Sequence, residues 1–197
     1  VPNATCLAAE DQPTPKCDAL LMGCGIAEND DTYADMMRLK ATDACQVWDA
    51  GALNLLAGHP QQLGARAVIT PHAGEAARLL GWEIPAVLSD KLGAAEALRA
   101  KYGCNVVLKS AVTVMLTADG QQCALNAVGS PALAKGGSGD ALAGILASLL
   151  GQGLPMFDAM RAACLWLGLA GIAAGKRCGV RAALTGDVID SLGACEG

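Results

Sequence analysis

Short apolar runs alternate with longer helical patterns along most of this 197-residue chain. Six runs have the length and composition of buried strands, at 18–23, 44–48, 67–70, 105–109, 113–117 and 122–125. Helical patterns follow at 30–39, 52–57, 74–80, 89–101, 140–150, 156–174 and 185–192. Strands that alternate with helices of about ten residues predict an α/β fold, in which helices cover both faces of a mainly parallel sheet. The Asp119-Gly120 dipeptide predicts a hairpin turn between the last two strands.

The composition predicts a single globular domain over residues 1–197 that binds neither nucleic acid nor membranes. Hydrophobic residues make up 53% of the chain and aromatic residues only 3%, so the core must consist of Ala, Leu, Val, Ile and Met. The net charge of −5 excludes a basic surface for nucleic acid. The sequence contains no unbroken apolar run of about 18 residues, and residues 1–5 do not resemble a signal peptide.

Nine cysteines are scattered through the apolar segments, without the spacing of a zinc site or a redox pair. A chain of this length does not need disulfides to stabilise its core. We therefore expect reduced thiols and a cytoplasmic protein. The Pro-containing stretch at 10–15 is expected to be a surface loop.

Residues 135–140 read KGGSGD and stand at the predicted start of an apolar helix. The first N–H groups of a helix lack internal partners, and glycines allow a phosphate to approach them closely. Asp140 is poorly suited to binding an anion but well placed to accept a proton from a hydroxyl. The pattern favours phosphoryl transfer to an alcohol over a plain helix cap formed by Ser138 or Asp140.

Other candidate residues follow predicted strands, where α/β proteins bind ligands. Gly25 stands in a glycine pair after the first strand, His72 after the third and Lys109 after the fourth. His72 could donate a hydrogen bond to a substrate, or simply begin a helix together with Pro71. Lys109 could meet a nucleotide phosphate, or end a strand in solvent.

Asp49 follows the second strand, and an N-cap is the favoured interpretation of this residue. The alternative is that Asp49 and Asn54 orient the substrate or a metal-bound water. We predict no role for His59.

Together and in order, several segments resemble the ADP- or ATP-dependent NAD(P)H-hydrate dehydratases, which have a ribokinase-like fold. The resemblance runs from about residue 18 and rests on Gly23-Cys24-Gly25, VWDAGALNLLAG at 47–58, ITPHAGEAARLLG at 69–81, VVLKSAVTVM at 106–115, NAVGSPALAKGGSGDALAGILASLLGQG at 126–153 and LTGDVIDSLG at 184–193.

The resemblance implies a three-layer α/β/α sandwich that repairs hydrated NADH or NADPH with the help of ADP or ATP and Mg²⁺. The ring hydroxyl is phosphorylated, phosphate then leaves, and the double bond returns. The implied catalytic positions are Asp140 as the base, with Gly137, Ser138 and Gly139 around the transferred phosphoryl group. The implied substrate positions are Gly25, His72 and Asp140. The implied nucleotide positions are Lys109, Ser110, Ala111, Val112, Thr113, Ser130, Gly136 and Gly139. No dedicated metal site is expected, and ADP is expected over ATP.

The chain also departs from the family pattern. Ser110 replaces a usual glycine, and a βαβ portion that usually precedes residue 18 is missing. We therefore expect an N-terminally truncated sandwich with an open sheet edge, and a homo-oligomer or a complementing chain that covers it. Two alternatives remain: a kinase for a hydroxymethylpyrimidine or thiazole alcohol, and a non-catalytic nucleotide-binding fragment.

Overall fold

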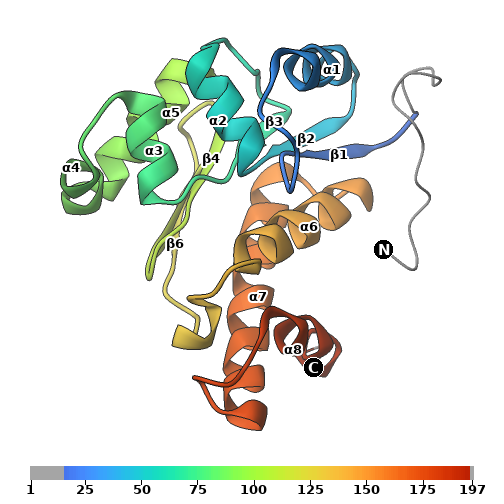
Figure 1. Ribbon diagram of the computed structural model, residues 1–197, viewed down its shortest axis with the longest axis vertical. Coiled ribbons are helices and arrows are strands. Elements are labelled where there is room, and N and C mark those ends of the chain that lie inside the picture. The colour runs from blue at the N-terminus through green and yellow to red at the C-terminus, as the bar shows by residue number, and fades with distance from the viewer. Residues whose placement is uncertain (1–15, 196–197) are drawn as a thin grey trace.

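Six short strands form one mixed sheet in the computed structural model, which describes residues 16–195 (Figure 1). The strands lie in sequence order: β1 (Ala19–Met22), β2 (Cys45–Trp48), β3 (Ala67–Ile69), β4 (Asn105–Leu108), β5 (Thr113–Leu116) and β6 (Cys123–Asn126). The first four are parallel, and β4, β5 and β6 are antiparallel. The predicted strands and hairpin are confirmed.

The central strands are buried on both faces, as their continuous apolar sequences predict. In β2, Val47 faces one side of the sheet and Trp48 the other, and neither is exposed to solvent. Trp48 and Tyr102 are the largest fully buried side chains, so two of the few aromatic residues belong to a core that was expected to be aliphatic.

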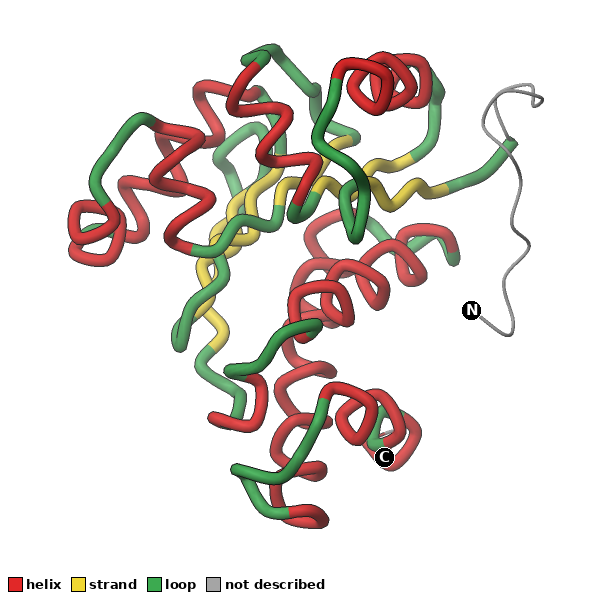
Figure 2. Tube along the Cα trace, viewed as in Figure 1, coloured by secondary structure: helices red, strands yellow, loops and turns green. Residues whose placement is uncertain are grey.

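Helices cover both faces of the sheet, which confirms the predicted α/β architecture (Figures 1 and 2). One face carries α1 (Asp30–Lys40), α2 (Gly51–Gly58), α3 (Ala73–Leu80), α4 (Ile84–Ser89) and α5 (Lys91–Tyr102). The other carries α6 (Ser138–Gly151), α7 (Met156–Cys178) and α8 (Thr185–Asp190), with short 3₁₀ turns at Pro131–Leu133 and Gly193–Cys195. Because the first four strands are parallel, their C-terminal ends lie together at one end of the sheet, facing the start of α6.

The helix predicted at 89–101 is wrong at its start. The structure has two helices, α4 and α5, which meet at Asp90. The Asp90 carboxylate accepts a hydrogen bond from the Gly93 N–H at 2.8 Å and so caps α5. The break has a local cause, because a capping carboxylate offers the backbone an alternative to continuing the helix.

Helix α7 is the one helix in residues 16–195 that is long and apolar enough to cross a membrane by length and composition. Its buried residues, among them Met160, Ala163 and Ala170, belong to the core beneath the sheet. The helical pattern at 156–174 predicted this helix, but the search for an unbroken apolar run did not single it out because charged residues such as Asp158 and Arg161 interrupt it. Its packing is that of a core helix.

Among the cysteines in residues 16–195, Cys104 and Cys164 are buried and Cys123 is exposed. Burial raises the pKa of the Cys164 thiol to about 12 and raises that of Cys104 further. Cys24, Cys45, Cys178 and Cys195 are partly buried free thiols. The loop expected at 10–15 lies outside the described residues.

Candidate active site

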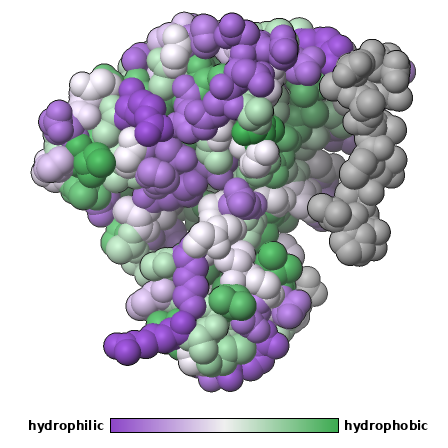
Figure 3. Space-filling view, in the orientation of Figure 1, coloured by the Kyte–Doolittle hydropathy of each residue, from purple (hydrophilic) through white to green (hydrophobic). Residues whose placement is uncertain are grey.

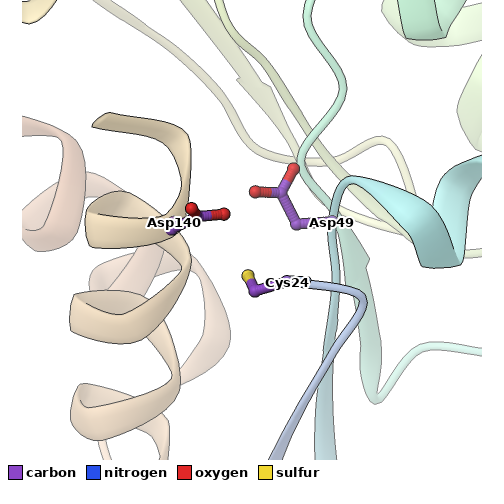
Figure 4. Close-up of side chains that lie close together, drawn as sticks. All are labelled: Cys24, Asp49 and Asp140. Atoms are coloured by element: carbon purple, nitrogen blue, oxygen red, sulfur yellow. The ribbon is translucent and has the colours of Figure 1, made fainter. Parts of the chain in front are cut away.

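The residues that follow β1, β2, β3 and β4 meet at the C-terminal ends of these strands, opposite the first turn of α6. Figure 4 shows Cys24 and Asp49 on the strand side and Asp140 on α6, with the three side chains turned toward one another. The Cys24 sulfur and the carboxylate oxygens of the two aspartates lie within 4.8 Å of one another. An isolated parallel β-bridge joins the backbones of His72 and Lys109 at the same end of the sheet.

The first turn of α6 is left open for an anion. Gly137 stands at the N-cap in the left-handed conformation, with φ of 88°, and no side chain caps the helix. The less favoured alternative, a plain cap formed by Ser138 or Asp140, is therefore wrong. The Ser138 hydroxyl is the one buried side-chain nitrogen or oxygen in residues 16–195 without a hydrogen-bond partner. Unpartnered donors at a helix start form a phosphate-binding arrangement.

Asp49 is a site residue that the favoured sequence interpretation missed. Its carboxylate is 2% exposed and forms an ion pair with the Lys109 ammonium at 2.7 Å. The Glu75 carboxylate lies 3.9 Å from the same nitrogen. The N-cap of α2 is Ala50, whose φ is 48°, so the prediction that Asp49 caps this helix is wrong. Its position after a strand was the signal that could have identified it.

Glycines allow the walls of the site to approach one another. A Cβ at Gly139 would lie 3.1 Å from the Lys109 nitrogen and 3.5 Å from the Asp49 carboxylate. A Cβ at Gly23, where φ is 120°, would lie 1.7 Å from the Asp49 carbonyl oxygen. Only glycine can occupy position 23 without moving the loop that carries Cys24, whereas a side chain at 139 would require the end of Lys109 to shift.

His72 begins α3 and has one ring nitrogen occupied. Its Nδ1 accepts hydrogen bonds from the N–H groups of Gly74 at 2.9 Å and Glu75 at 3.3 Å. The Glu75 carboxylate in turn accepts from the His72 N–H at 2.7 Å, which completes a capping box. In the neutral ring the proton is therefore on Nε2, which leaves this nitrogen as the donor. The other histidine, His59, for which no role was predicted, stacks its ring on that of Tyr33.

The side chains near Asp140 supply only some of the ligands that a magnesium ion requires. Mg²⁺ requires oxygen ligands, which Asp49 and Asp140 can supply, whereas the Cys24 thiol does not suit it. A magnesium ion here would depend on nucleotide phosphates and water for most of its ligands.

The Cys24 thiol is expected to react slowly with alkylating reagents. Burial, a hydrogen bond to Asp140 and the charges of Asp140 and Asp49 raise its pKa to about 12. At pH 8 the thiolate fraction is therefore about 10⁻⁴, and the alkylation rate should rise about tenfold per pH unit up to pH 11. Iodoacetamide labelling followed by peptide mass spectrometry measures this rate, with exposed Cys123 as the internal comparison. Labelling of Cys24 as fast as Cys123 at pH 8 would contradict the expectation.

A pocket of about 680 Å³ extends from this site between the strand ends, α6 and α7. Of the sequence-predicted residues, its lining includes His72, Lys109, Ser110, Ala111, Thr113, Ser130, Ser138 and Gly139. Asp140 lies beside it with Cys24 and Asp49. Gly25, Val112, Gly136 and Gly137 do not line it.

The loop at 126–134 closes the far side of the pocket and packs directly on the backbone of α7. A Cβ at Gly168 would lie 2.3 Å from the Val128 carbonyl oxygen, and one at Gly171 would lie 2.6 Å from Leu133. The small residues of this helix therefore position a pocket wall.

Two further residues tie the glycine turn to the C-terminal segment. The Lys135 ammonium donates hydrogen bonds to the carbonyl oxygens of Arg181, at 2.7 Å, and Ala183. The Thr185 hydroxyl donates to the Gly136 carbonyl at 2.8 Å. Gly136 thus supports the turn from behind. No local sequence signal connects these residues, because they are about fifty positions apart.

The sheet order, the helix layers and the glycine-led helix define a ribokinase-like protein. The family model for NAD(P)H-hydrate dehydratase matches residues 4–193, beginning before the residue 18 at which the resemblance was expected to start. The chain therefore belongs to the NAD(P)H-hydrate dehydratase family.

Individual relatives agree with this assignment. The bifunctional NAD(P)H-hydrate repair enzyme Nnr of Vibrio cholerae is 43% identical over 77% of this chain and 30% of its own length. The ADP-dependent (S)-NAD(P)H-hydrate dehydratase of Neisseria meningitidis is 37% identical over 80% of this chain and 54% of its own length. The chain thus spans about a third to a half of these curated relatives.

A solved structure extends the similarity to three dimensions. The ADP/ATP-dependent NAD(P)H-hydrate dehydratase of Bacillus subtilis, co-crystallised with ATP and Mg²⁺ and soaked with CoA, superposes with a TM-score of 0.82. The match is 25% identical and covers 94% of this chain and 68% of that one.

Proposed function

We propose that this chain catalyses the ADP-dependent dehydration of hydrated NADH and NADPH, which returns NADH or NADPH for reuse. One observation carries the proposal: the Asp140 carboxylate stands in the first turn of an uncapped, glycine-led helix, beside a pocket of nucleotide size. Family membership supplies the substrate class.

Asp140 acts as the general base in this reaction. It accepts the proton of the ring hydroxyl while the terminal phosphoryl group of ADP moves to that oxygen, and AMP remains. The N–H groups around Gly137, Ser138 and Gly139 stabilise the charge on the transferred group, together with the unpartnered Ser138 hydroxyl. Phosphate then leaves the ring, and loss of a proton from the neighbouring carbon restores the double bond.

The substrate and the nucleotide approach from different sides. The hydrated dinucleotide lies toward Gly25 and His72, where the Nε2–H of His72 is available to donate. ADP occupies the pocket between Lys109–Thr113 and Ser130–Gly139. Magnesium bound to the nucleotide would neutralise its phosphate charge, with Asp49 and Asp140 as the facing carboxylates.

We further propose a cytoplasmic protein that associates with itself or with a complementing chain. Buried free thiols such as Cys104 suit a reducing compartment. Strand β1 ends the sheet and has a backbone edge unpaired by any strand in residues 16–195. Exposed apolar side chains also gather on and beside α4: Trp82, Ile84, Leu88 and Leu92. Green hydrophobic atoms are visible at the left of the molecule in Figure 3, where α4 lies in Figure 1.

The decisive experiment is a dehydration assay with purified NADHX and NADPHX. With ADP and Mg²⁺, we expect the absorbance of the reduced nicotinamide to return and AMP and phosphate to form in equal amounts. Parallel reactions contain ATP or no nucleotide. A stable phosphorylated alcohol would identify a kinase instead, and a folded protein without turnover would overturn the proposal.

A further inference from the structure

The pocket of about 680 Å³ has two chemically different ends. Lys109, Ser138 and Gly139 line the end nearest Asp140. The other end lies between the loop at 126–134 and α7, where Val128 and Leu167 are part of its apolar lining. If ADP binds with its phosphates at α6, as proposed above, its base must lie in this apolar end.

The polar side chains lining the apolar end already have partners within the protein. The Asn126 amide nitrogen donates to the carbonyl oxygens of Val128 at 3.0 Å and Cys164 at 3.3 Å. The Ser130 hydroxyl accepts from the Ala132 N–H at 3.2 Å. These groups close the loop onto itself and onto α7.

The segment after β4 is organised in the same way. The Thr113 hydroxyl donates to the Ser110 carbonyl oxygen at 3.2 Å, and the Ser110 hydroxyl donates to the Val112 carbonyl oxygen at 2.5 Å. In the apolar end the Asn126 amide oxygen and the Ser130 hydroxyl proton have no hydrogen-bond partner within residues 16–195. The amide oxygen, as an acceptor, suits the exocyclic amines of adenine, guanine and cytosine equally, and the rotatable hydroxyl can donate to a ring nitrogen of any purine.

Strong selection between bases requires site groups that the wrong base leaves unpaired. A pocket that offers apolar contact alone separates similar ligands by only about 10- to 200-fold. In the apolar end the Asn126 amide oxygen is an acceptor that several bases can use, whereas the one buried side-chain oxygen without a partner in residues 16–195, the Ser138 hydroxyl, lies at the phosphate end. The structure therefore places its polar recognition on the phosphates rather than on the base.

We propose that this site selects its nucleotide by the diphosphate and accepts different purine bases. This inference rests on the proposed use of a nucleotide and specifies the substrate class further. GDP and IDP are bound and used in place of ADP, whereas adenosine, which lacks the phosphates, is not.

Isothermal titration of the full chain in Mg²⁺ with ADP, GDP, IDP and adenosine tests the proposal. We expect the three diphosphates to have dissociation constants within about 100-fold of one another, and adenosine to bind more than 100-fold more weakly than ADP. Discrimination of more than 1,000-fold between ADP and GDP would overturn the proposal while leaving ADP-dependent dehydration intact. Tolerant binding without NADHX turnover would overturn the proposed function alone. Failure of all three diphosphates to bind would overturn both.

A pair of variants separates the two ends of the pocket. Ser138→Ala should raise the dissociation constants of ADP and GDP by the same factor, roughly 3- to 20-fold, so that the ratio of the two constants stays unchanged. Ser148→Ala, on the exposed side of the same helix, is the matched control and should change neither. A change in the ADP-to-GDP ratio in Ser138→Ala would show that the base is read through the phosphate end, contrary to the proposal.

Discussion

Replacement of Asp140 by Asn is expected to lower the rate of NADHX dehydration by about 10²- to 10⁴-fold, the usual contribution of a general base. The amide is nearly isosteric with the carboxylate but cannot take the hydroxyl proton. Because Asp140 is exposed and does not cap α6, the change should leave stability within about 0.5 kcal/mol. The measurement is kcat with saturating ADP, together with the dissociation constant for ADP.

Asp158→Asn provides the matched control for this variant. Asp158 also stands in the first turn of an apolar helix, α7, but outside the site, and its carboxylate only faces Arg161. It should retain full activity. An Asp140→Asn enzyme with an undiminished rate would show that another group is the base.

Replacement of Lys109 by Met is expected to lower the free energy of unfolding by about 3–5 kcal/mol, the typical cost of leaving a buried charge without its partner. The Asp49 carboxylate is almost fully buried, and the Lys109 ammonium at 2.7 Å is its counter-ion. Since small domains have only about 5–15 kcal/mol of stability, the loss would be a large fraction of the total. Urea unfolding followed by circular dichroism measures it.

Two comparisons show whether the ion pair is responsible. Arg66→Met breaks the exposed pair with Asp43 and should cost less than about 1 kcal/mol. Adding Asp49→Asn to Lys109→Met removes the orphaned charge and should restore a large part of the lost stability. A Lys109→Met protein as stable as Arg66→Met would contradict a buried, mutually dependent pair.

The elements of this fold were predictable because each strand is a short apolar run and most helices are periodic over two or more turns. The 74–80 pattern, for example, became α3 almost unchanged. The break at Asp90 was missed because one carboxylate decides locally between a continuing helix and a new one. The apolar length of α7 was missed because charged residues, such as Asp158 and Arg161, interrupt its hydrophobic run.

The site was predictable where one segment contains the whole signal, as in the KGGSGD turn. It was not predictable where the signal is a distance. The position of Asp49 after a strand marks it as a possible site residue, but nothing in the local sequence separates a cap from an ion pair with Lys109, sixty residues away. Lys135 and Thr185 depend in the same way on a C-terminal segment that returns to the glycine turn.

The sequence by itself determined the order of strands and helices, the α/β class and a glycine-led helix start that suits a phosphate. These follow from local periodicity and backbone freedom, which neighbouring residues decide among themselves. Only the tertiary structure decided that Asp49 pairs with Lys109, that Cys24 faces Asp140 and that Asn126 donates to the Cys164 carbonyl oxygen of α7. The physical reason is that a charge or hydrogen bond acts over a few ångströms, and chain folding alone brings distant residues within that range.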